Sequence, residues 1–105
     1  MYINIHQPLI DRCLDNDKEA QYSLYKLYYR SMYNTSLRII NNSDDAEDIM
    51  QESFLVAFEQ IGTCPGNVSF GEWLKRIVRN RSIESWRKNR KVILEDIGSF
   101  CVTEG

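Results

Sequence analysis

Apolar residues recur at spacings of three and four along most of the chain, and the strict alternation of a β-strand is not found. Residues 8–14 carry a short pattern of this kind, introduced by Pro8, and residues 16–40 carry a long one. The long stripe consists of Tyr22, Tyr25, Tyr29, Tyr33, Leu37 and Ile40, widened by Leu24 and Tyr28. The pattern predicts an all-α fold, a compact bundle of three long helices plus a short N-terminal helix.

Capping boxes, in which a Ser, Asp or Asn side chain precedes a Glu by three residues, mark the starts of the long helices. They are Asn16 with Glu19, Asp44 with Glu47, and Ser69 with Glu72. A break near Arg30 or Ser31 in the first long helix is compatible with the pattern. The second long helix is expected to end at about Gln60, before a Gly/Pro-rich loop at residues 62–67, and the last at about Lys91.

The chain of 105 residues is long enough for one modest core but not for two. We expect one domain over residues 1–91, while residues 92–105 lose the helical periodicity and are expected to be the start of a linker or a mobile tail. No apolar run approaches the roughly 20 residues that span a bilayer, and the N-terminus lacks the parts of a signal peptide. These features predict a cytoplasmic protein without membrane insertion.

The cysteine and histidine content disfavours a metal centre and a disulfide framework. Cys13, Cys64 and Cys101 are odd in number, widely spaced and form no C-x-x-C pair, which predicts free thiols in a reducing compartment. His6 is the single histidine, so a structural zinc site is not expected, and no cofactor is predicted.

Opposite charges are sorted along the chain, although the formal net charge is only −2. Residues 1–60 contain five basic and ten acidic side chains, whereas residues 61–91 contain eight basic and two acidic ones. Because local charge governs local binding, a near-neutral chain of this kind can bind a nucleic acid on one surface and a basic protein on another.

At 100° per residue, the predicted helix at residues 45–60 divides into two faces. The face expected in the core carries Ala46, Met50, Phe54, Ala57, Phe58 and Ile61. The opposite face carries Asp45, Asp48, Glu52 and Glu59, with Leu55 and Val56 beside them. A solvated acidic face is the ordinary interpretation, but two aliphatic side chains among four carboxylates are typical of a protein interface. A metal-dependent carboxylate enzyme is disfavoured because this helix carries no histidine and no second carboxylate helix faces it.

The last predicted helix also has two faces. The inward stripe is Phe70, Trp73, Leu74, Ile77 and Val78, and the opposite side carries Lys75, Arg76, Arg79, Arg87 and Arg90, with Asn80 at the border. Trp73, on the first turn, either fills the core or stacks on a base, whereas Trp86 is expected to pack against a neighbouring helix. A basic face bordered by an aromatic side chain and an amide suits binding to phosphates and an unstacked base, although basic helices are also common on ordinary proteins.

Two segments carry a resemblance to a known family. They are Asp45–Phe54, with the sequence DAEDIMQESF, and Ser69–Glu84, with the sequence SFGEWLKRIVRNRSIE. In this order and spacing they resemble region two of bacterial sigma factors, particularly the extracytoplasmic-function (ECF) group of the sigma-70 family. The resemblance covers roughly residues 8–91, and the loop at residues 62–68 is its least defined part.

The resemblance implies a role for each face. In the family, the D-x-x-Q-E helix binds the clamp helices of core RNA polymerase. The corresponding residues here are Asp48, Gln51, Glu52 and Leu55, and Asp45 and Glu59 on the same face complete the expected polymerase-binding set. The family's loop and its W-L-x-R-I-x-x-N helix melt the promoter and capture a flipped base of the −10 element. The expected DNA-binding residues are Asn67, Ser69, Trp73, Arg76, Arg79 and Asn80, to which the basic face adds Lys75 and Arg87.

By this resemblance we expect a non-enzymatic sigma factor domain that binds core polymerase and the non-template strand of the −10 element, with an anti-sigma factor as a further partner. The alternative is a sigma-like module that binds only protein, as a decoy for the polymerase or for an anti-sigma factor. The sequence after Lys91 is too short for the helix-turn-helix domain by which the family reads the −35 element. We therefore expect one domain of a longer protein or a truncated protein.

Overall fold

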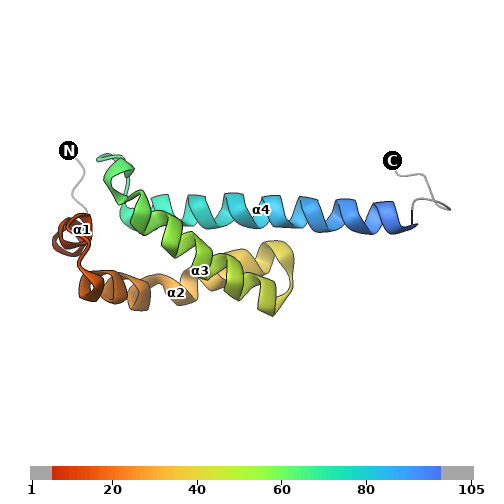
Figure 1. The fold of residues 1–105 in the computed structure, drawn as a ribbon, viewed down its shortest axis with the longest axis horizontal. Helices are drawn as coiled ribbons and strands as arrows, with labels where there is room; N and C mark the ends of the chain where they lie inside the picture. The colour runs from red at the N-terminus through yellow and green to blue at the C-terminus, as the bar shows by residue number, and fades with distance from the viewer. Residues whose placement is uncertain (1–5, 98–105) are drawn as a thin grey trace.

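Within residues 6–97, the fold consists of four α-helices and one short 3₁₀ turn (Figure 1). The computed structural model describes the backbone of residues 6–97 and the side chains of residues 6–89. The elements are α1 (Gln7–Leu14), α2 (Lys18–Ile40), α3 (Ser43–Glu59), the 3₁₀ turn η1 (Ile61–Thr63) and α4 (Phe70–Ile97). None of the residues described forms a strand, so the predicted all-α bundle of three long helices and a short N-terminal helix is confirmed.

The central element is α2, which packs against α1, α3 and α4. It is continuous from Lys18 to Ile40, without the break considered near Arg30 or Ser31. Helices α3 and α4 also pack against each other, and η1 contacts α1 and α3. The 28 residues of α4 make it roughly 42 Å long at 1.5 Å per residue. Its C-terminal end therefore extends beyond the other helices (Figure 1).

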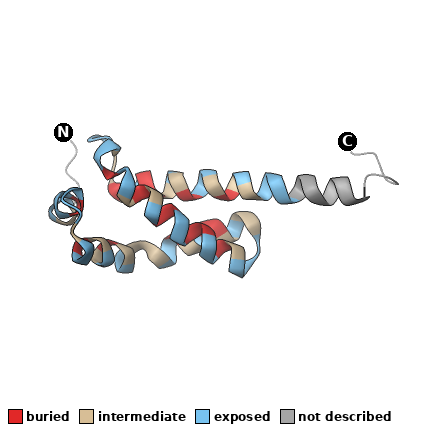
Figure 2. Ribbon diagram, in the orientation of Figure 1, coloured by how far each residue is buried: buried red, intermediate tan, exposed pale blue. Residues whose placement is uncertain are grey.

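The buried faces of the helices meet in one apolar core (Figure 2). Its fully buried large apolar side chains are Leu24, Phe54, Phe70, Leu74 and Val78. Of the apolar stripes predicted on α3 and α4, only Phe58 and Ile77 are partly exposed rather than buried. The α3 prediction also omitted Ile49 and Ser53, which are buried. The buried arc of α3 is wider than predicted because this helix packs against both α2 and α4.

A pair of buried hydroxyl groups joins α2 to α4. Ser36 and Ser82 are completely buried, and their hydroxyl oxygens lie 2.7 Å apart. The Ser82 hydroxyl oxygen also lies 2.7 Å from the carbonyl oxygen of Val78. A hydroxyl donates one hydrogen bond and can accept others, so this cluster satisfies both side chains within the protein. The small size of serine allows the two helices to pack closely at this point.

The start of α2 differs from the prediction by one residue. Asp17, rather than Asn16, is the N-cap, because its Oδ1 accepts hydrogen bonds from the backbone amides of Glu19 at 3.0 Å and Ala20 at 3.3 Å. Asn16 has a φ of 64°, a left-handed conformation that asparagine tolerates but that an N-cap does not adopt. The turn after α1 thus decides which of two good capping residues is used.

The start of α3 also differs from the prediction. Asn42 is the N-cap instead of Asp44, and its Oδ1 accepts a hydrogen bond from the backbone amide of Asp45 at 3.0 Å. The preceding residue, Asn41, ends α2 in a left-handed conformation with a φ of 55°. The chain changes direction between α2 and α3 within the two residues Asn41 and Asn42. Helix α3 therefore begins at Ser43, one residue before the predicted cap.

The predicted cap of α4 is confirmed, because the Ser69 hydroxyl accepts a hydrogen bond from the backbone amide of Glu72 at 3.1 Å. The other end of α4 differs from the prediction. The helix continues to Ile97 rather than ending at about Lys91, so the first part of the predicted linker or tail is helical. The remainder of that segment, residues 98–105, lies outside the described residues.

A glycine on the first turn of α4 lies against an aromatic ring of α2. A Cβ atom added to Gly71 would lie 2.9 Å from Cε1 of Tyr28, closer than side chains normally pack. The Tyr28 ring makes edge contacts with His6 and Phe70, with ring centroids 5.5 and 5.6 Å apart. No glycine in the described part of the chain has a positive φ. Gly71 is therefore required for close packing and not for an unusual backbone conformation.

We predict that Gly71→Ala lowers the free energy of unfolding by up to about 2 kcal/mol. Overlap with the Tyr28 ring should cost about 1–3 kcal/mol, and the better helix propensity of alanine should offset up to about 1 kcal/mol of that cost. Urea unfolding followed by circular dichroism measures the difference. Gly66→Ala is the control, because a Cβ atom there has no neighbour within 4 Å. A gain in stability of about 1 kcal/mol, which is the full effect of helix propensity, would contradict the packing requirement.

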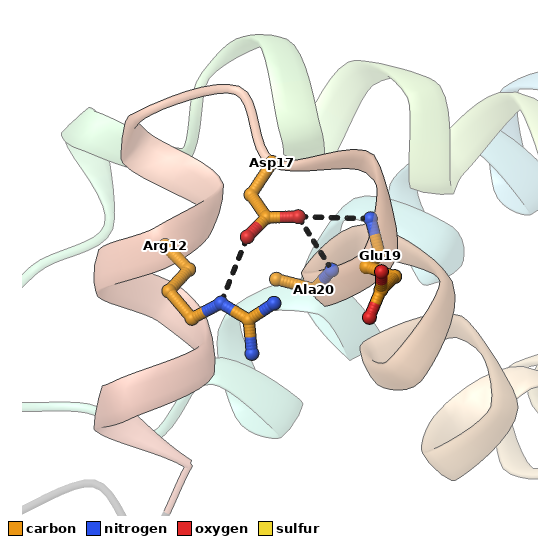
Figure 3. Close-up of polar contacts among 4 residues, drawn as sticks. All are labelled: Arg12, Asp17, Glu19 and Ala20. Carbon is orange, nitrogen blue, oxygen red and sulfur yellow. Dashed lines mark hydrogen bonds and ion pairs between the residues drawn. The ribbon is translucent and has the colours of Figure 1, made fainter.

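An ion pair supports the junction between α1 and α2 (Figure 3). The Nε atom of Arg12 lies 2.8 Å from Oδ2 of Asp17, the same carboxylate that caps α2. The Arg12 hydrogen bond, followed by the backbone amide of Ala20, lowers the pKa of Asp17 below its ordinary value of 3.8. The unfolded state therefore binds a proton more readily than the folded state, and this carboxylate contributes more stability as the pH rises.

We predict that the stability difference between the wild type and Asp17→Asn depends on pH. Asparagine can still cap the helix but cannot form the ion pair. The difference should be complete above pH 3.8 and should shrink as the pH falls through the lowered pKa of Asp17. Urea unfolding at intervals from pH 7 to pH 3 measures it. Arg12→Gln should show the same trend, and a pH-independent difference for both variants would contradict the assignment.

Candidate functional site

The acidic face predicted on α3 lies on the molecular surface. Its exposed members are Asp48, Gln51, Glu52, Leu55 and Glu59, whereas Asp45 and Val56 are partly exposed. Leu55 is 67% exposed, a high value for a large apolar side chain. The opposite side of α3 is buried against α2 and α4, so these residues project into solvent. The predicted exposure of an apolar side chain among polar and acidic side chains is thus confirmed for Leu55.

A groove of about 310 Å³ separates this face of α3 from α4. It is lined by Asp45, Asp48, Ile49 and Glu52 of α3 and by Arg81, Glu84, Ser85, Lys88 and Asn89 of α4. Across the groove, Nη2 of Arg81 lies 3.0 Å from Oε1 of Glu52. The sequence prediction assigned no role to Arg81. The available signal was its position four residues after Ile77, which continues the inward stripe of α4 toward a neighbouring helix.

The basic side chains predicted on α4 are mostly accessible. Arg76, Arg79, Asn80 and Arg87 are exposed, and Lys75 is partly buried. Arg90 belongs to the same predicted face, but its side chain lies outside the described residues. A second groove, of about 450 Å³, is lined by Asn80, Arg81, Ile83, Glu84 and Arg87. The structure therefore brings two predicted DNA-binding residues, Asn80 and Arg87, to one groove, with Arg76 and Arg79 nearer the start of the helix.

The two tryptophans of α4 have different environments. Trp73 is 9% exposed and lies next to Phe70, with ring centroids 6.0 Å apart. This supports the core interpretation of Trp73, and its ring face is not open to a stacked base in this conformation. Trp86, which was expected to pack against a neighbouring helix, is 42% exposed, so its side chain is only partly covered.

The loop between α3 and α4 carries the remaining predicted DNA-binding residues. Asn67 is exposed, and Ser69 is partly buried because its hydroxyl caps α4. That hydroxyl accepts the capping hydrogen bond and keeps its own proton for donation. On the side toward α1 the loop borders a pocket of about 200 Å³. Its lining comprises Gln7, Ile10, Leu14, Ile61, Gly62, Cys64, Pro65, Gly66 and Val68, and includes neither Asn67 nor Ser69.

The thiols of Cys13 and Cys64 are free, as predicted, and Cys101 lies outside the described residues. Burial raises the pKa of both thiols, and the carboxylate of Asp17 raises that of Cys13 further. A thiol with a raised pKa stays protonated at neutral pH and is a poor nucleophile. Among the side chains described, those of residues 6–89, no cluster of three or more potential metal ligands is present. No helix within residues 6–97 is both long and apolar enough to cross a bilayer.

Comparisons with known proteins agree with the arrangement of these helices. The family model described as Sigma-70 region 2 matches residues 24–92, which include most of α2, all of α3 and most of α4. No solved structure matches the chain significantly.

Curated relatives match over the same part of the chain. The ECF RNA polymerase sigma factor SigW of Bacillus subtilis is 34% identical over 74 residues, which are 70% of this chain and 40% of the relative. The RNA polymerase sigma-H factor of Pseudomonas aeruginosa is 31% identical over 74 residues, 70% of this chain and 38% of the relative. The ECF RNA polymerase sigma-E factor of Haemophilus influenzae is 32% identical, again over 70% of this chain and 39% of the relative. The chain thus spans about 40% of the length of these relatives, and the match of the family model to more than half of its residues shows that it belongs to the Sigma-70 region 2 family.

Proposed function

We propose that this chain is the part of a sigma factor that binds core RNA polymerase and captures the opened −10 element of a promoter. It acts in the cytoplasm as a non-enzymatic subunit of the transcription machinery. One observation carries the proposal beyond family membership: an acidic face with an exposed apolar centre and a separate basic face lie on two helices that pack against each other. Each face has the chemistry of a different macromolecular partner.

The face on α3 suits a basic protein surface such as the clamp helices of the polymerase. Leu55 supplies an apolar contact that is exposed in the free chain. Asp48, Glu52 and Glu59 form an acidic rim around it, and Gln51 adds an amide. A desolvated apolar centre within a polar rim is the usual anatomy of a protein interface, and the charges of the rim favour a basic partner.

The face on α4 suits the phosphates and one base of a single strand. Expelling a base from the duplex costs a few kcal/mol in lost stacking, which hydrogen bonds to the expelled base can offset. Exposed Arg76, Arg79 and Arg87 can bind phosphates without reading sequence. Asn80 presents an amide that can donate to and accept from a base edge. Trp73, being buried, is proposed to support this surface and to contact DNA only through its edge.

A protein-only role is the second candidate, and the exposure of Leu55 favours it independently of DNA. An isolated apolar side chain within a charged rim can bind an anti-sigma factor as well as the polymerase, because the two would use the same surface chemistry. In this role the chain would occupy one of these proteins without recognising a promoter. Sequence-dependent binding of single-stranded DNA distinguishes the two candidates.

We predict that Asp48→Lys combined with Leu55→Asp abolishes binding to core polymerase while retaining the fold. Asp48 and Leu55 are exposed and lie outside the ion pairs of the described residues, so stability should change by less than about 1 kcal/mol. Glu52→Lys is a poorer choice, because it would place a lysine against Arg81. Co-purification with core polymerase measures binding, and circular dichroism checks the fold.

The matched control for this variant is Asp15→Lys combined with Leu27→Asp. It makes the same chemical changes at exposed positions of the α1–α2 part of the molecule. The control should bind core polymerase like the wild type. Undiminished binding by the α3 variant, or equal loss in both, would overturn the assignment of this face.

We predict different effects for two substitutions on α4. Arg79→Ala should weaken binding to every single-stranded oligonucleotide alike, because one phosphate contact is lost. The salt slope, which is the fall in the logarithm of the binding constant per logarithm of salt concentration, should decrease by about 0.7. Asn80→Ala should instead reduce the preference for a −10-like strand over a scrambled strand by about 1–3 kcal/mol. Fluorescence anisotropy with single-stranded and duplex probes at two salt concentrations measures both effects.

Two control variants accompany this experiment. Asn89→Ala removes an exposed amide from α4 on the groove that faces α3, and Arg38→Ala removes an exposed arginine from α2. Asn89→Ala should leave the preference for the −10-like strand unchanged, unlike Asn80→Ala. Arg38→Ala should leave the affinity and the salt slope unchanged, unlike Arg79→Ala. Equal loss of affinity on all sequences in Asn80→Ala, or a preference of the wild type for closed duplex, would favour the protein-only role.

A further inference from the structure

Arg81 is the residue at which the two candidate surfaces meet. It lines the groove between α3 and α4, and it also lines the second groove that contains Asn80 and Arg87. We propose that Arg81 is a further phosphate-binding residue for the single strand. In the free protein its guanidinium is paired with the Glu52 carboxylate, and it is released when a basic side chain of the polymerase pairs with Glu52 instead. This inference rests on the proposed function, because it couples polymerase binding to DNA binding.

The geometry allows the Arg81 side chain to serve either groove. Its Nη2 atom lies 3.0 Å from Glu52 Oε1, and the two side chains are 39% and 58% exposed. Arg87 and Asn80 border the second groove, so a guanidinium turned away from Glu52 would join side chains already assigned to DNA. Arginine suits this exchange because its planar group binds carboxylates and phosphates in the same bidentate manner.

The weakness of the ion pair is what makes exchange feasible. Exposed pairs of this kind change an equilibrium by only a few-fold, because water screens them and both side chains lose freedom when they pair. A buried pair would hold Arg81 too strongly for a partner to displace it. Glu52 belongs to the face proposed to bind the polymerase, so a basic group of the polymerase would compete with Arg81 for the same carboxylate.

The exchange implies positive coupling between the two partners. If polymerase binding frees Arg81 for DNA, then DNA binding frees Glu52 for the polymerase, and linkage requires the two effects to be equal in size. Glu84 can compete with DNA for the released Arg81, because its carboxylate borders both grooves and is a second possible acceptor for the guanidinium. Capture of the released Arg81 by Glu84 would cancel the gain in DNA affinity, which the following experiment detects.

The test measures binding of fluorescent oligo(dT) to the full chain by anisotropy at two salt concentrations. Glu52→Gln removes the carboxylate that holds Arg81, so it should bind roughly two- to fivefold more tightly than the wild type. Its salt slope should be steeper by about 0.7, as expected for one additional phosphate contact on a single strand. In a Glu52→Gln/Arg81→Gln double variant, both changes should disappear.

Asp48→Asn is the matched control, because it removes one negative charge from the same groove without breaking an ion pair of the described residues. It should raise affinity less than Glu52→Gln and leave the salt slope unchanged. The proposal is overturned if Glu52→Gln binds no more tightly than the wild type or if Asp48→Asn matches it. It is also overturned if the gain survives in the double variant.

A second measurement examines the polymerase side of the exchange. Arg81→Gln leaves Glu52 without a competitor, so its affinity for core polymerase should rise roughly two- to fivefold. A fall in affinity would mean that Arg81 positions Glu52 instead, and the exchange would be wrong. The oligo(dT) experiment contains no polymerase and no −10 sequence. Its outcome therefore decides the role of Arg81 even if the proposed polymerase face or base recognition fails its own test.

Discussion

The close packing of α4 against α2 is the constraint on which the rest of the structure depends. It begins at Gly71, where the absence of a side chain admits the Tyr28 ring, and it continues to the buried contact between Ser36 and Ser82. Between these points α4 buries Leu74 and other apolar side chains in the core. Because a helix is rigid over a few turns, these contacts fix the rotation of α4 about its axis, and with it the direction in which each basic side chain projects.

The same constraint separates most residues that stabilise the fold from those assigned to binding, although Trp73 and Ser69 belong to both sets. The core consists of side chains with almost no exposure, whereas the candidate binding residues are largely exposed and make few contacts within the protein. Exposed charges contribute little to folding. Binding properties can therefore change by substitution of Asp48 or Arg79 without loss of the fold, while Gly71 and Ser82 leave little freedom for substitution.

Sequence periodicity predicted the helices and most of the two faces because side chains rotate by a fixed angle along a helix. Local patterns were less successful where two neighbouring residues could perform the same task. Asn16 and Asp17 are both good capping residues, and the backbone of the turn after α1 selects Asp17. The sequence left two interpretations of Trp73, and only packing between helices could decide for the core. The helical periodicity placed Arg81 on the inward stripe of α4, but it could not identify its partner Glu52, which lies 29 positions away in the sequence.

The length of α4 has a mechanical consequence. The helix is held against α2 from Gly71 to Ser82, and its C-terminal end extends beyond the other helices (Figure 1). This end can therefore bend only at points after the Ser36–Ser82 contact. Ile97 lies 15 residues after Ser82, or roughly 22 Å at 1.5 Å per residue, so a bend of about 10° at Ser82 would displace it by about 4 Å. Arg76 and Asn80 precede the bend and would not move, whereas Arg87 follows it, so bending of this end should change the reach of the basic face without changing the position of the residue proposed to read the base.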